Sequence, residues 1–165
     1  MRHDKHALHA FCLAGYTILL GFFFSMVEVQ IEGSQGWAAS LPTWRIEHHP
    51  LLSILWGGRP ITGYHVWVFS FMAFVFHFPL FVLGTWSLRF EARVLGCLMF
   101  FWVFEDFFWF VFNPAYGAAK LFHGEVIWHK HMILFLPHDY WLFLILGSLL
   151  LYWSFRGQKN ICTPC

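Results

Sequence analysis

The sequence predicts an all-α integral membrane protein: a bundle of four transmembrane helices with two long outer loops. Hydrophobic residues make up 59% of the 165 residues and charged residues only 12%, whereas a soluble domain carries about 25% charged residues. The mean hydropathy is +0.59, and the apolar residues gather in runs that approach the roughly 20 residues needed to cross a bilayer. Residues 1–165 are therefore expected to form a single membrane domain.

Four apolar runs define the expected spans. They cover residues 8–29, 63–86, 92–112 and 139–155. The first run is longer than the roughly 7–15 apolar residues of a signal peptide, so we expect it to be retained as a helix. Gly57 and Gly58 break the chain before the second span, and Asn113-Pro114 ends the third, because Gly and Pro interrupt regular structure.

Two long loops, residues 30–62 and 115–137, join these spans on the same side of the bundle. Trp37 and Trp44 in the first loop are typical of a membrane–water interface. The apolar segment 51–56 is too short to span a bilayer, which predicts a short interfacial helix within this loop.

The distribution of Lys and Arg predicts the orientation. The side that holds both termini collects six of these residues: Arg2, Lys5, Arg89, Arg93, Arg156 and Lys159. The other side has four, diluted over the two long loops: Arg45, Arg59, Lys120 and Lys130. By the positive-inside rule we expect both termini in the cytoplasm, in a plasma or inner membrane, and both loops outside. The formal net charge of +1 gives no reason to expect a nucleic-acid partner.

Two adjacent acids interrupt the most apolar stretch of the chain. Glu105 and Asp106 lie within FFWVFEDFFWFVFNP, residues 100–114. An acid near the bilayer centre costs roughly 2.5–3.5 kcal/mol on insertion scales, and an ionisable residue at that depth indicates a functional site by default. We therefore predict that Glu105 and Asp106 are catalytic, the alternative being that they are buried hydrogen-bonding groups that join helices.

The expected topology brings further acids and histidines to the outer half of the bundle. A helical bundle with inward Glu and His side chains is a common way to build a metal site, including di-iron sites. Imidazole and carboxylate ligands suit a divalent metal such as Fe or Zn. The predicted ligands are Glu28, Glu32, His65, Glu105, Asp106, His129 and His131, with Glu125, His138 and Asp139 as surrounding groups.

Several functions fit this pattern. The first is a membrane enzyme that acts on a lipid or other apolar molecule through the outer carboxylate and histidine cluster, with a metal or by metal-free acid–base chemistry. The second is an electron-transfer subunit in which His65 and His138 would be the axial ligands of haem b. The third is a non-enzymatic transporter, which could act as a homo-oligomer, or an assembly subunit of a larger membrane complex.

Sequence motifs do not decide between these functions. The chain has no HExxH motif, and no motif identifies a family. The C-terminal pair Cys162 and Cys165 is compatible with a redox pair or half of a metal site.

Overall fold

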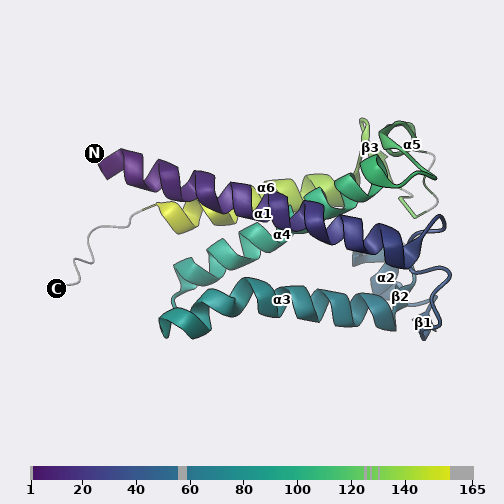
Figure 1. The fold of residues 1–165 in the computed structure, drawn as a ribbon, viewed down its shortest axis with the longest axis horizontal. Coiled ribbons are helices and arrows are strands. Elements are labelled where there is room, and N and C mark those ends of the chain that lie inside the picture. The colour runs from purple at the N-terminus through teal and green to yellow at the C-terminus, as the bar shows by residue number, and fades with distance from the viewer. Residues whose placement is uncertain (1, 56–58, 125, 127, 130, 157–165) are drawn as a thin grey trace.

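Long helices dominate the computed structural model, which describes residues 2–55, 59–124, 126, 128, 129 and 131–156. The long helices of the described chain are α1 (Arg2–Glu32), α3 (Gly63–Leu83), α4 (Leu88–Phe112) and α6 (His138–Phe155). They run along one common axis (Figure 1). The start of α1, the end of α6 and the α3–α4 connection lie at one end, which we call the turn end. Both long loops lie at the opposite end, the loop end (Figure 1).

Three of these helices are long and apolar enough to cross a membrane. The candidate spans among the described residues are Leu8–Glu32, Gly63–Leu83 and Leu88–Phe112. The fourth expected span, residues 139–155, corresponds to α6, which has 18 residues and is not among these candidates. Its first turn carries His138 and Asp139, which lower its apolar character. Three helices long and apolar enough to cross a membrane are thus confirmed, whereas a count of four is not.

Short elements fold the two loops over the loop end. The first loop contains β1 (Arg45–Ile46), α2 (Pro50–Leu55) and β2 (Ile61–Thr62). The second contains α5 (Ala118–Phe122), β3 (Met132–Ile133) and β4 (Leu136–Pro137). The antiparallel pairs β1–β2 and β3–β4 were absent from the all-α prediction. The short helix expected within the first loop is confirmed by α2.

Helix α4 is the centre of the bundle, because α1 and α6 both pack along it. Gly96 of α4 faces Gly147 of α6, and a Cβ at Gly96 would lie 3.0 Å from the Gly147 carbonyl oxygen. Small residues let helices in a membrane approach closely. Helix α3 joins this core through Met72 and Phe76, which pack with Phe101 of α4.

The connection between α3 and α4 is shorter than the connection between the expected spans 63–86 and 92–112, and it lies earlier in the chain. Helix α3 ends at Leu83 rather than residue 86, because Gly84 takes a left-handed conformation at φ +61° and its N–H donates to Leu80 O. Helix α4 begins at Leu88 rather than residue 92, because Ser87 caps it by accepting from the Phe90 N–H at 3.1 Å.

Candidate functional site

A cavity of about 360 Å³ lies among the long helices, with one polar and one apolar half. Five carboxylic acids line the polar half: Glu28, Glu32, Glu105, Asp106 and Asp139. Six large apolar side chains line the other half: Phe69, Leu95, Leu98, Met99, Leu142 and Phe143. A cavity of this size is within the range of small-molecule sites, which are about 300–1,000 Å³.

Helix α1 contributes two buried acids from one face. It continues without a break to Glu32, so Glu28 and Glu32 form the i, i+4 pair expected from the sequence. Tyr64 donates its hydroxyl hydrogen bond to Glu28 Oε1 at 2.7 Å. Glu32 Oε1 accepts the backbone N–H of Ala38 at 2.5 Å, which ties the first loop to the end of α1.

Glu105 of α4 lies against this pair. It is only 4% exposed, and its Oε1 atom has no hydrogen-bond partner within the described part of the chain. Its carboxyl group is within hydrogen-bonding reach of the Glu28 carboxyl. Two carboxyl groups can form a hydrogen bond only when at least one of them carries a proton. A hydrogen bond between Glu28 and Glu105 at the cavity would therefore require a proton on one of them.

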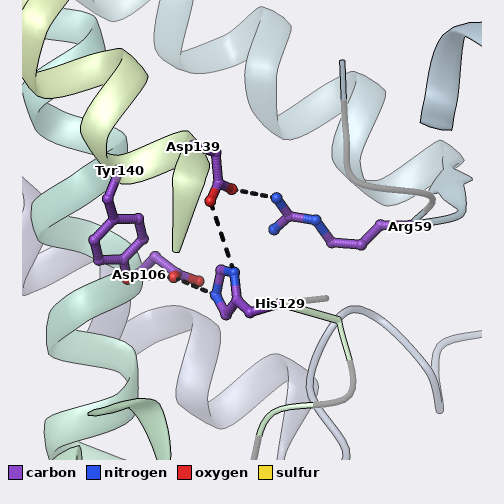
Figure 2. A network of polar contacts seen from close by, with 5 residues as sticks. All are labelled: Arg59, Asp106, His129, Asp139 and Tyr140. Carbon is purple, nitrogen blue, oxygen red and sulfur yellow. Dashed lines mark hydrogen bonds and ion pairs between the residues drawn. The ribbon is translucent and has the colours of Figure 1, made fainter. Parts of the chain in front are cut away.

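Asp106 belongs to a separate network shown in Figure 2. The His129 ring lies between two carboxyl groups, with Nε2 at 3.0 Å from Asp106 Oδ2 and Nδ1 at 3.9 Å from Asp139 Oδ1. Tyr140 also donates to Asp106 Oδ2, and Arg59 pairs with Asp139. An ionised Asp106 can only accept, so in that state His129 donates through Nε2 and its Nδ1 faces Asp139.

His129 is the buried centre of this network, whereas the Asp106 and Asp139 side chains are 25% and 20% exposed. The His129 side chain is 1% exposed. Among the described residues, neither His129 Nδ1 nor Asp139 Oδ1 has a hydrogen-bond partner, and the 3.9 Å between these two atoms is too long for a hydrogen bond. Buried polar atoms normally find partners, and a catalytic role is one explanation of an exception. The second loop thus places a buried histidine in hydrogen-bond contact with Asp106 and near Asp139.

Trp37 of the first loop holds two basic groups at the cavity. The Trp37 and His65 rings stack with 4.2 Å between their centroids. The Arg59 guanidinium lies over the Trp37 ring, 4.6 Å from its centroid. Its Nε1–H donates to Pro60 O at 2.7 Å. Trp37 and Ala38 both have positive φ values, 46° and 51°. Non-glycine residues in this region store backbone strain, which often accompanies a functional site.

Gly36 lets the first loop approach the aromatic side chains that line the cavity. Its φ is +62°, and a Cβ there would lie 2.5 Å from Trp128 Cη2 and 2.9 Å from Trp109 Cη2. No larger side chain fits without a shift of these rings.

Tyr116 also ties the first loop to the site. Burial and the Glu32 carboxyl raise the pKa of Tyr116, so its phenol keeps its proton and donates to Gln35 O at 3.3 Å.

The expected metal centre is not supported. Among the described residues, no group of three or more His, Cys, Asp or Glu side chains is arranged to hold a metal ion. The acids instead have protein partners, such as Tyr64 for Glu28 and the Ala38 N–H for Glu32. Glu28, Glu32, His65, Glu105 and Asp106 do line one cavity, and His129 contacts Asp106. His131, in contrast, is exposed.

The two histidines considered for haem lie in different surroundings. His65 is buried beside Thr62, with 2.7 Å between its Nδ1 and Thr62 Oγ1, and it lines the cavity. His138 instead packs edge-on against the His131 ring at 5.6 Å.

Sequence reasoning missed several residues of this site. Arg59 entered only as a loop charge, and Trp37 only as an interfacial residue, while Tyr64 and Tyr140 were not considered. One sequence signal could have indicated Arg59. Gly57, Gly58 and Pro60 surround it and predict a turn, and a turn can direct a charged side chain inward. Glu125, Cys162 and Cys165 lie outside the described residues.

Comparisons with known proteins found no match for this chain. No family model matches the chain, and neither the curated proteins nor the solved structures contain a significant match.

Proposed function

We propose that this protein is an integral-membrane enzyme that acts on a lipid or other apolar molecule by acid–base chemistry. The observation that carries the proposal is the amphipathic cavity. Glu105 Oε1, which has no hydrogen-bond partner among the described residues, lies at its acid-rich wall, while Leu98 and Met99 line the apolar half. A pocket of this kind, with buried ionisable groups converging on one end, is the usual form of an active site.

The chemistry would use two groups of residues in turn, the Glu28–Glu105 pair and the Asp106–His129–Asp139 network. Glu105, together with Glu28, would transfer a proton to or from the substrate. The Asp106–His129–Asp139 network would exchange that proton with the loop end, with Tyr140 holding Asp106 in place. Two sets of acids in different surroundings can take opposite acid and base roles.

The apolar half supports entry from the bilayer. Leu95 and Leu142 line the cavity, yet they are 38% and 49% exposed, so its wall extends to the outer surface of the helices. Leu95 lies within the candidate span Leu88–Phe112. An apolar substrate could therefore pass from the hydrocarbon to the acids without crossing water.

The orientation follows from the basic residues. With more Lys and Arg at the turn end, both termini would lie in the cytoplasm of a plasma or inner membrane, and the cavity would lie in the outer leaflet.

An apolar layer favours an enzyme over a proton-conducting transporter. Phe76, Val94, Cys97 and Phe101 form a buried cluster in the turn-end half of the bundle, between the cavity acids and His77. A conducting path would need polar groups or water across this layer, whereas catalysis at the cavity does not.

Transfer of a proton between solvent and a substrate carbon can be followed with deuterium. Purified protein would be incubated in D₂O with the total lipid extract of the membranes in which it is produced, and the lipids compared by mass spectrometry. We expect one lipid class to gain deuterium or change its structure, and Glu105→Gln to abolish the change. Glu91→Gln is the matched control, because Glu91 is on the same helix at the turn end. An unchanged lipid profile with folded wild-type protein would contradict the proposal.

A further inference from the structure

The acids of the cavity differ in how their charge is balanced. Asp139 pairs with Arg59, and Asp106 with His129. The described partners of Glu28 and Glu105 are the Tyr64 hydroxyl and the two carboxyl groups themselves, and none of these is a cation. A buried carboxylate without a cationic partner is costly. A positively charged ligand group at this pair would offset that cost.

The surrounding aromatic side chains fit the same kind of ligand. Four tryptophans line the cavity: Trp37, Trp102, Trp109 and Trp128. The indole face attracts cations more strongly than other aromatic rings do, and aromatic cages recognise alkylated ammonium groups. This mode already occurs in the cavity, where the Arg59 guanidinium lies over Trp37 at 4.6 Å.

The apolar half defines the rest of the ligand. Leu95, Leu98 and Met99 lie along α4 toward the turn end from Glu105. A charged group held at Glu105 would therefore leave an attached hydrocarbon chain against these side chains. A small hydrophilic amine would leave this apolar surface uncovered.

We propose that the cavity binds an amphiphile whose head is a positively charged amine, held by Glu105 and Glu28 among the tryptophans, with its hydrocarbon chain along Leu95, Leu98 and Met99. This inference rests on the proposed function in that it names the class of molecule which the same site would take. Its geometric basis is Glu105 at the cavity, which is 4% exposed and whose Oε1 atom has no hydrogen-bond partner among the described residues.

The test uses three probes with the full-length protein in neutral maltoside micelles. Isothermal titration calorimetry would compare dodecyltrimethylammonium, the uncharged dodecanol and the chainless tetramethylammonium. We expect one dodecyltrimethylammonium per chain, with both other probes at least about tenfold weaker, which is about 1.4 kcal/mol. Dodecanol binding as tightly would overturn the role of the charge, and tetramethylammonium binding as tightly would overturn the role of the chain.

Variants locate the site. Glu105→Gln should weaken dodecyltrimethylammonium binding by about tenfold or more, while Glu91→Gln at the turn end should leave it unchanged. Should Glu105→Gln fail to fold, Met99→Trp provides a second test, because it fills the apolar half and should block the chain. Unchanged binding in a folded variant at either position would overturn the proposal.

The two proposals can fail separately. Amine binding that requires Glu105, without any deuterium entering a lipid, would contradict the enzyme and leave the binding site intact. Deuterium entering a lipid, with no preference for the amine probe, would contradict the amine head and leave the enzyme intact.

Discussion

Charged side chains are arranged differently at the two ends of the bundle. At the turn end, the His77 and Glu91 side chains pair at 3.1 Å and are each about one-quarter exposed, at 25% and 27%. Arg89 and Arg93 there lie over the rings of Trp153 and Phe155. At the loop end, acids from α1, α4 and α6 face a buried cavity. Surface pairs contribute little to stability, whereas buried polar groups are costly unless satisfied, so the loop end has the arrangement that needs a functional explanation.

The largest expected difference between the ends involves Asp106. Asp106→Leu removes the acceptor of both His129 and Tyr140 and leaves two buried donors unsatisfied. The Asp106 side chain itself is 25% exposed, but each buried donor left unsatisfied costs about 1–3 kcal/mol, so we expect a loss of about 3–5 kcal/mol in the free energy of unfolding, measured in mixed detergent micelles. Glu91→Leu at the turn end should cost no more than about 1 kcal/mol. Equal losses at the two positions would show that the ends do not differ in this way.

Arg59 offers a second, smaller contrast. Arg59→Met removes the cation from Asp139, whose side chain is 20% exposed, and from the face of Trp37. Because Asp139 keeps some contact with solvent, we expect a loss of about 2–4 kcal/mol, at or below the range for a fully buried pair. Arg89→Met at the turn end should change the free energy of unfolding by about 0–1 kcal/mol. A loss at Arg59 as small as at Arg89 would contradict a buried ion pair.

Two glycines sharpen the comparison for the backbone. Gly36 and Gly84 have nearly equal φ values, +62° and +61°, but only Gly36 has side chains within 4 Å of an added Cβ. Gly84→Ala should cost about 1 kcal/mol from the left-handed conformation alone. Gly36→Ala should cost about 2 kcal/mol, because it also displaces Trp128. Thermal unfolding of the two variants would measure the difference, and equal midpoints would indicate that the first loop does not pack tightly on the cavity.

The candidate site shows how far sequence reasoning reached. Glu105 and Asp106 were singled out because an acid in an apolar run is costly, and Glu28 and Glu32 because of their helical spacing. Both arguments depend on local properties. The same reasoning grouped His129 with His131, two residues apart, yet one is buried on Asp106 and the other is exposed. The path of a loop decides which of two neighbouring histidines faces inward, and no periodic pattern records that path.

The sequence by itself determined that the chain forms long apolar helices with ionisable residues at defined depths, because composition and hydropathy along a helix are local. It also determined that the acids needed partners. Only the tertiary structure decided which partners they have: Tyr64 for Glu28, His129 and Tyr140 for Asp106, and Arg59 for Asp139. It also left one Glu105 oxygen at the cavity without a hydrogen-bond partner from the described residues. The physical reason is that these contacts join residues 23 to 80 positions apart, so they arise from helix packing and loop paths rather than from any spacing along the chain.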